Sequence, residues 1–202
     1  MDFDLTEEQR AIRDAVARIC SRFDDAYWLE RERTGTFPED FAAEIAKGGF
    51  YGVTMEEQYG GSGLGITEAS LVMQEIGRYG AAASSAVHIN IFGLQPVVGF
   101  GTDEQKERIL RPMARGDVTW GQAWSEPNAG SDLASLKSTA RRVDGGWRLS
   151  GQKTWSTRAA FCDMAYGLFR SDPEQARHRG LTYFMFPLHA EGVTVRGVDR
   201  LD

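Results

Sequence analysis

Two segments of the sequence combine residues that could bind a planar redox ring joined to a pyrophosphate. Residues 123–132 (the first motif) read Ala-Trp-Ser-Glu-Pro-Asn-Ala-Gly-Ser-Asp, and residues 151–157 (the second motif) read Gly-Gln-Lys-Thr-Trp-Ser-Thr. The Ala-Gly-Ser step offers backbone N–H groups to an anion, and an aromatic residue beside two hydroxyls suits a planar ring. Glu126–Pro127 alone is equally typical of a simple turn. Because no helix or strand needs this combination for its own stability, the two motifs together predict a flavin-binding site.

Length and charge limit the other functions of the chain. Its 202 residues suffice for one or two domains, and 42% hydrophobic with 26% charged residues is typical of a soluble globular protein. The net charge of −6 argues against nonspecific nucleic-acid binding, which needs a basic excess. Residues 1–117 carry 12 Lys and Arg against 20 Asp and Glu, whereas residues 118–202 carry 11 against 9. A phosphate-rich ligand is therefore expected on the second part.

No metal site, disulfide or targeting segment is expected. Cys20 and Cys162 match no ligand spacing and are expected to be reduced thiols. His88, His178 and His189 share no spacing typical of metal ligands. The N-terminus is acidic, and no apolar run approaches the ~20 residues that a membrane span needs. We therefore expect a cytoplasmic protein without a metal and without a membrane span.

Residues 1–117 have the pattern of an all-helical domain. Thr6–Gln9 and Thr102–Gln105 are capping boxes, which start helices. The apolar residues Ile12, Val16, Ile19 and Phe23 recur at intervals of four, three and four and form one helical stripe. The expected helices run from 7 to about 23, from Pro38 to Gly48, from about 67 to 79, from 86 to 100, and from 103 to near Gly116. The Gly-rich residues 60–65 lack the Gly-x-Gly-x-x-Gly pattern and are expected to be a plain loop between helices.

Residues 118–202 have the pattern of a β domain. Short segments rich in β-branched and aromatic residues alternate with turn signals, among them Asp144–Gly146 and a polar loop from Ser171 to Arg179. The expected strands lie at 118–120, 138–141, 147–149, 166–169, 181–186 and 193–195. Helices followed by strands predict an α+β fold with segregated domains. A hydrolase is not supported, because the sequence has no Gly-x-Ser-x-Gly elbow.

The order of three motifs gives the chain a specific resemblance. The loop at 59–63, the Ser-Glu-Pro-Asn-Ala-Gly-Ser-Asp run at 125–132 and the second motif resemble, in this order, motifs of the acyl-CoA dehydrogenase family of flavoenzymes. The resemblance covers the chain from its first helix to its last residue. It implies a helical N-terminal domain and a β-barrel-like or β-sandwich middle domain, cut before a C-terminal four-helix bundle.

The resemblance implies FAD as cofactor and assigns roles to individual residues. Ser125 and nearby main-chain N–H groups would reach the polar edge of the flavin ring, Trp155 would pack beside the ring, and Thr157 would lie near its N5 atom. Ser131 would lie where cofactor and acyl-CoA converge, and Ser171 would contact the pantetheine arm. The full set of expected cofactor-binding residues is Gln122, Ala123, Trp124, Ser125, Gly130, Ser131, Trp155, Ser156 and Thr157.

The implied reaction is α,β-dehydrogenation of an acyl-CoA thioester, with an electron-transfer flavoprotein as acceptor and a homo- or hetero-oligomeric assembly. The family's general base lies in the C-terminal domain, so it is expected beyond residue 202, and no catalytic residue is assigned. The 202 residues alone are accordingly expected to be inactive and prone to aggregation, with Asp199–Asp202 leading into further strands. Three positions depart from the family pattern, Met55, Trp124 and Arg158, and they bear on the shape of the acyl pocket.

Two other functions are consistent with the sequence. The chain could be a noncatalytic flavin- or acyl-CoA-binding subunit that needs a partner bearing the base. It could also belong to a related flavin oxidase or monooxygenase, which passes electrons to oxygen.

Overall fold

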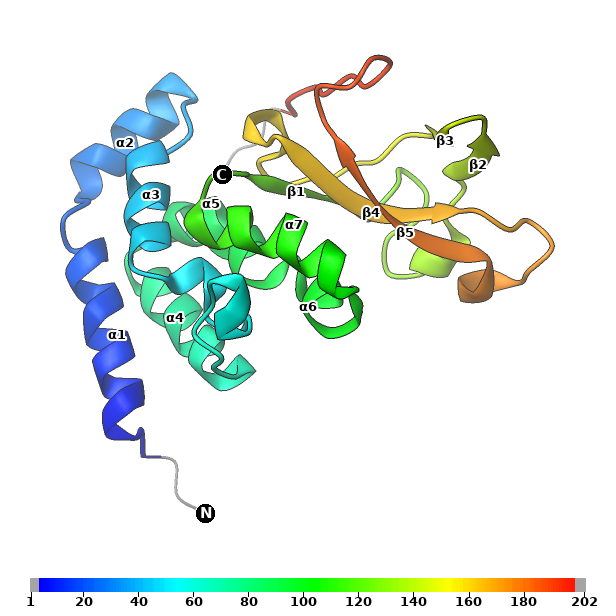
Figure 1. Ribbon diagram of the computed structural model, residues 1–202. Coiled ribbons are helices and arrows are strands. Elements are labelled where there is room, and N and C mark those ends of the chain that lie inside the picture. Colours follow the sequence, from blue (N-terminus) through cyan, green and yellow to red (C-terminus); the bar gives the residue numbers. More distant parts are fainter. Residues whose placement is uncertain (1–3, 199–202) are drawn as a thin grey trace. The chain divides into compact units, whose positions relative to one another are not determined.

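A computed structural model describes residues 4–198, and within them the backbone of Ala81 but not its side chain. The chain divides into two compact units between Thr119 and Trp120. We call the first the helical unit and the second the β unit, and describe each by itself (Figure 1). The expected lead-in to further strands at 199–202 lies outside the described residues.

Capped helices build the helical unit. Thr6 and Thr102 accept hydrogen bonds from the backbone N–H groups of Gln9 (3.1 Å) and Gln105 (3.2 Å), which confirms both capping boxes. The α-helices among the described residues are α1 (Glu7–Cys20), α2 (Asp25–Thr34), α3 (Glu39–Lys47), α4 (Ile66–Arg78), α5 (Ala81–Phe92), α6 (Gln95–Phe100) and α7 (Asp103–Arg115).

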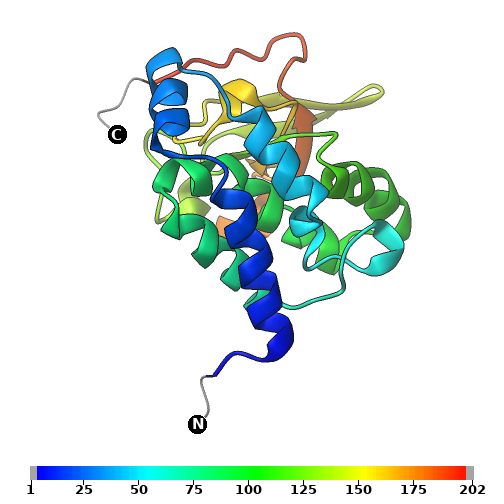
Figure 2. The same ribbon diagram turned by 90° about the vertical axis from the view of Figure 1, so that its left-hand side faces the viewer.

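The predicted apolar stripe of α1 faces the core of this unit. Val16 is fully buried, and Ile12, Ile19 and Phe23 pack against the same cluster of buried side chains. Phe23 lies after α1, because the helix ends at Cys20 and not at about residue 23 as expected. α1 packs along α4. Figure 2 views the molecule from the side on which α1, the blue helix, lies. The loop that holds residues 60–65 joins helical segments, as expected, and Gly60 and Gly63 have φ of +88° and +64°, which few residues other than glycine adopt.

Two helical predictions were wrong. α2 was missed because it has no buried residue and hence no apolar stripe. It is defined instead at its ends, where the Asp24 side chain accepts from the Tyr27 N–H at 2.9 Å and Gly35 has φ +63°. The segment 86–100 is not one helix. α5 begins earlier, at Ala81, and ends at Phe92, and α6 starts anew at Gln95.

A mixed sheet of five strands forms the β unit. Its strands are β1 (Trp120–Ala123), β2 (Thr139–Val143), β3 (Gly146–Ser150), β4 (Met164–Arg170) and β5 (Leu181–Pro187). β4 pairs parallel with β1, from Trp120↔Met164 to Ala123↔Gly167, and antiparallel with β5 along its whole length. β2 meets β4 only at Thr139↔Arg170 and forms a hairpin with β3. The order of helices followed by a β domain is thereby confirmed.

Two strand predictions needed correction. The first strand runs over 120–123 rather than 118–120, so it leads directly into the first motif. Residues 193–195 form no strand. Their composition favours one, but they pair with no other strand among residues 4–198, and Val193 and Val195 are exposed. Without ladder hydrogen bonds, β-branched residues alone do not make a strand.

Candidate functional site

The fold brings the two motifs side by side. β1 contains Gln122 and Ala123, and Trp124 and Ser125 follow at its end. The second motif follows β3, and its Thr154 N–H donates to the Ser125 carbonyl at 2.9 Å. Segments that are separate in the sequence thus share a backbone hydrogen bond at the end of β1.

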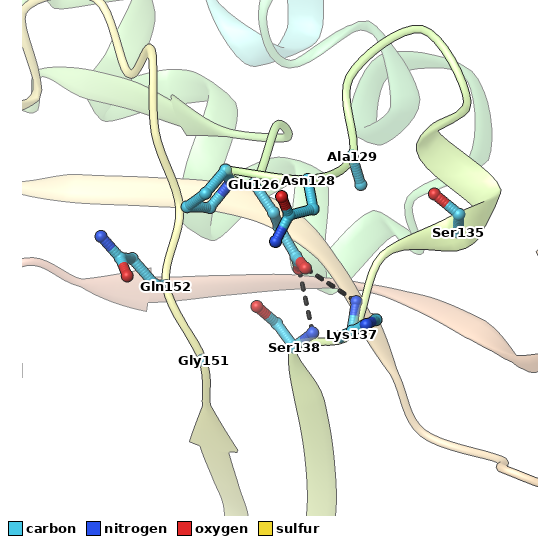
Figure 3. A pocket seen from close by; sticks show the side chains of 9 residues that line it. Glu126, Asn128, Ala129, Ser135, Lys137, Ser138, Gly151 and Gln152 are labelled. Atoms are coloured by element: carbon cyan, nitrogen blue, oxygen red, sulfur yellow. Dashed lines mark hydrogen bonds between the residues drawn. The ribbon is translucent and has the colours of Figure 1, made fainter.

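The Glu126–Ala129 turn shapes the first motif. Glu126 N–H donates to the Ala129 carbonyl at 2.7 Å, and Ala129 N–H donates back at 3.1 Å. The Glu126 side chain points away from the turn toward the start of β2, where it accepts from the backbone N–H groups of Lys137 (2.7 Å) and Ser138 (2.9 Å) (Figure 3). The turn interpretation of Glu126–Pro127 is therefore right, but the carboxylate also anchors a distant segment.

Lys153 completes this anchor. Its ammonium lies 3.0 Å from the Glu126 carboxylate, and the two side chains are only 11% and 8% exposed. The same ammonium donates to the carbonyls of Trp124 (3.2 Å) and Leu168 (2.8 Å). Both charged side chains of this pair are therefore satisfied inside the β unit.

The pair shifts the ionisation of both groups. Burial by itself raises the pKa of Glu126, but the neighbouring Ser138 hydroxyl, the two backbone N–H groups and the Lys153 ammonium outweigh it and bring the pKa to about 2. Burial lowers the pKa of Lys153, and the attraction of Glu126 offsets only part of that effect. Glu126 is consequently a carboxylate at every physiological pH.

The rest of the second motif presents an exposed aromatic ring. Trp155 has φ +56° and its side chain is 67% exposed. Ser156 and Thr157 are half-buried, and a turn closes where the Ala159 N–H donates to the Ser156 carbonyl at 3.1 Å. A left-handed backbone at a tryptophan costs on the order of 1 kcal/mol or more, and such strain is found at functional positions.

The remaining predicted residues lie on two loops, the one after the Glu126–Ala129 turn and the one after β4, and an ion pair joins these loops. Gly130 and Ser131 are exposed and follow the Glu126–Ala129 turn. Ser171 follows β4, and its hydroxyl lies 2.6 Å from that of Thr182. Arg177 donates to Asp132 at 2.7 Å and thereby holds the loop after β4 against the loop of Ser131.

Sequence reasoning missed an aromatic cluster beside Trp124. The ring centroid of Trp124 lies 5.3 Å from that of Tyr166 in β4 and 5.9 Å from that of Tyr183 in β5. The two tyrosine rings stack with their centroids 5.7 Å apart. Burial raises the pKa of Tyr166 to about 12, so its phenol stays protonated. Tyr166 in β4 pairs in register with Gln122 in β1. Because side chains alternate between the two faces of a strand, the period of two in β4 is the signal that could have identified Tyr166 as a neighbour of the first motif.

A shallow open pocket of about 240 Å³ lies on one side of the Glu126–Ala129 turn, between the turn, Ser135–Ser138 and Gly151–Gln152 (Figure 3). None of the nine expected cofactor-binding residues lines it. The hollow therefore does not coincide with the residues expected to bind the flavin.

Two further features concern the described residues as a whole. Within residues 4–198, no three His, Cys, Asp or Glu side chains gather as metal ligands would. Over the same residues, no helix combines the length and apolar character that a membrane crossing requires.

Comparison with known sequences identifies two matching domain families. Residues 6–117 match the acyl-CoA dehydrogenase N-terminal domain, and residues 121–201 match the acyl-CoA dehydrogenase middle domain. Benzylmalonyl-CoA dehydrogenase of Aromatoleum aromaticum is 37% identical over 96% of this chain and 51% of its own length. The chain spans about half the length of the curated relatives it matches.

Solved structures give the same correspondence. Butyryl-CoA dehydrogenase from Megasphaera elsdenii superposes with a TM-score of 0.83 at 28% identity, over 95% of this chain and 51% of that one. A structure described as PigA with FAD and proline superposes with a TM-score of 0.86 at 25% identity, again over 95% and 51% of the two chains.

Proposed function

Because the chain belongs to the acyl-CoA dehydrogenase family, we propose that it binds FAD through its two motifs and serves the α,β-dehydrogenation of an acyl-CoA thioester. Family membership makes flavin-dependent oxidation of acyl-CoA-like substrates the general class of activity. The acyl chain, the electron acceptor and the activity of the whole protein belong to the proposal.

One observation carries the assignment of FAD to these residues. Among residues 4–198, the hydroxyls of Ser125, Ser131 and Thr157 have no hydrogen-bond partner in the protein, although they lie in two adjacent motifs. The second motif also exposes the indole of Trp155. Polar groups without a protein partner and an exposed aromatic surface, on two segments joined by a backbone hydrogen bond, match a ligand that is planar in one part and polar in another.

The residues present fit FAD. A side-chain atom added at Gly130 would meet nothing within 4 Å, so the backbone of the Ala-Gly-Ser step is open to a bulky anion. The Trp155 indole offers an apolar surface for a ring and would exclude water from it. When bound, FAD supplies an oxidised ring that accepts a hydride.

We assign roles to this chain's own groups accordingly. The Ser125 hydroxyl and nearby main-chain N–H groups would donate to the polar edge of the ring, where they favour negative charge on its reduced form. The Thr157 hydroxyl would donate near N5. Residues 122–131 would line the pyrimidine side and the pyrophosphate, and Ser131 and Ser171 would contact the acyl-CoA.

Neither carboxylate of the first motif suits the role of general base. Glu126 is tied to Lys153 and to two backbone N–H groups, and its pKa of about 2 makes it a poor proton acceptor. Asp132 is engaged with Arg177. We therefore assign a binding role to the first motif and no proton transfer. For the acceptor we propose an electron-transfer flavoprotein, and for the assembly a homo- or hetero-oligomer.

Replacing Ser131 and Thr157 by Ala tests the proposed FAD site. Each substitution is expected to weaken FAD binding about tenfold, because a hydrogen bond to a charged or polarised group contributes ~1–2 kcal/mol. The measurement is a titration of flavin fluorescence against the full-length protein. Ser70→Ala and Thr67→Ala change exposed residues of α4 and should leave the affinity unchanged. Equal affinity in all four variants and the wild type would remove the assignment.

A further inference from the structure

Lys153 occupies an unusual position for a lysine in a ligand-binding motif. It comes two residues before Trp155, yet its side chain is only 11% exposed and points into the β unit, where its partners lie. An ammonium has three N–H donors. Three acceptors surround it, namely the Glu126 carboxylate at 3.0 Å and the carbonyls of Trp124 at 3.2 Å and Leu168 at 2.8 Å.

These acceptors belong to segments that must stay in register. Glu126 and Trp124 lie in the first motif, and Leu168 lies in β4, the central strand. Glu126 also holds the start of β2 through Lys137 and Ser138. The next residue, Thr154, donates its N–H to the Ser125 carbonyl at 2.9 Å. One ammonium thus fastens the second motif to the first motif and to the sheet.

We propose that Lys153 is a positioning residue that fixes where Trp155–Thr157 stand relative to Ser125, and so sets the affinity of the chain for FAD. Lys153 acts through the backbone of its neighbours and has no direct contact with the cofactor. The effect on FAD rests on the proposed function. The effect on the register of the two motifs does not, because every contact that carries it lies within this chain.

A buried ion pair could instead contribute stability alone. A stabilising role depends on the ion pair with Glu126, whereas a positioning role also depends on the hydrogen bonds to the backbone carbonyls of Trp124 and Leu168. Removing Lys153 leaves the Glu126 carboxylate buried without its counter-ion, which destabilises a protein strongly, whereas removing both charges relieves most of that cost. The bonds to the Trp124 and Leu168 carbonyls need the ammonium and are not restored by a change at Glu126. A cycle of single and double variants therefore separates the two roles.

The experiment compares wild type, Lys153→Met, and the double variant Glu126→Gln/Lys153→Met. Lys106→Met is the control, because Lys106 also pairs with a carboxylate, Glu56 at 2.8 Å, but in the helical unit. Three quantities are measured for each protein: the thermal unfolding temperature, the dissociation constant for FAD, and the exchange rate of the Thr154 amide hydrogen.

Lys153→Met should unfold at a lower temperature and bind FAD at least tenfold more weakly. The double variant should recover more than half of the lost unfolding temperature. It should still bind FAD at least tenfold more weakly than wild type, and its Thr154 amide should exchange at least tenfold faster. Lys106→Met should match wild type in FAD affinity and in Thr154 exchange.

Two results would overturn the inference. One is a double variant that regains wild-type FAD affinity together with its stability, which would reduce Lys153 to half of a stabilising ion pair. The other is wild-type Thr154 exchange in the double variant. A wild-type chain that binds no FAD would refute the proposed function instead, and the Thr154 exchange rate would then decide the positioning role by itself.

Discussion

Acidification from pH 5 to pH 2 is expected to remove about 3 kcal/mol of folding free energy that depends on Glu126. The pKa of this carboxyl falls from 4.5 to about 2 on folding, so the unfolded chain takes up the proton first as the pH drops. The stabilisation is therefore fully present above about pH 4.5 and is lost as the pH falls through about 2. A difference of about 2.5 pKa units corresponds to about 3 kcal/mol.

Urea unfolding at several pH values measures this effect. Four of the five tryptophans, all except Trp28, lie in the β unit, so tryptophan fluorescence mainly reports its unfolding. Glu126→Gln should be less stable than wild type at pH 7, because Lys153 loses its counter-ion, and the difference should shrink toward pH 2. Glu107→Gln, which alters an exposed carboxylate in α7, should show the same dependence of the free energy of unfolding on pH as wild type. If the free energy of unfolding changed with pH in the same way for wild type and Glu126→Gln, the Glu126 carboxylate would not be stabilised by Lys153 and the two backbone N–H groups.

Replacing Gly167 by Ala should destabilise the β unit by about 3 kcal/mol. Gly167 lies in β4 opposite Ala123 of β1. A Cβ atom there would lie 2.2 Å from the Ala123 carbonyl oxygen, and this oxygen belongs to backbone that cannot withdraw without breaking the β1–β4 pairing. Overpacking of this kind typically costs 1–3 kcal/mol and more where backbone must move. The same urea titration, at pH 7, measures the loss.

Gly146→Ala provides a matched control in the same sheet. Gly146 begins β3, and a Cβ there would meet nothing within 4 Å. The substitution should be neutral or slightly stabilising, because alanine loses less backbone entropy on folding than glycine. If both alanine variants unfold at the same urea concentration, the close approach of β1 and β4 is not as tight as the structure has it.

The features predicted from the sequence are those with a local physical cause. A capping box needs only four neighbouring residues, so Thr6 and Thr102 could be identified directly. The stripe through Ile12 and Val16 repeats at the helical period and so predicted α1. The coarse division into helices and then strands followed from the same patterns.

The missed or corrected elements depend on partners that the sequence does not reveal. α2 has no fully buried side chain, and its apolar residues form no stripe along one face, so it has no periodicity to detect. The break between α5 and α6 lies within a continuously apolar segment. Residues 193–195 have strand composition, but whether they pair depends on a neighbouring strand rather than on themselves.

In the candidate site, too, the features with a local cause could be predicted from the sequence, and those that depend on distant contacts could not. The two motifs could be recognised from their residues and order, and that the backbone joins them through Ser125 and Thr154 agrees with the idea of a shared site. The anchoring role of Lys153 could not be predicted, because its partners lie 15 to 29 positions away and side-chain contacts at such separations leave no periodic pattern. The packing of Trp124 on Tyr183 likewise depends on how β5 pairs with β4.

Amide hydrogen exchange of the full-length protein with and without FAD locates the cofactor without relying on any substitution. We expect slower exchange on addition of FAD in two stretches, residues 122–131 and 153–157, and unchanged exchange in the glycine-rich loop at 60–65. Protection in that loop without protection in the two motifs would refute the assignment of FAD to these motifs, and so would the absence of any protection.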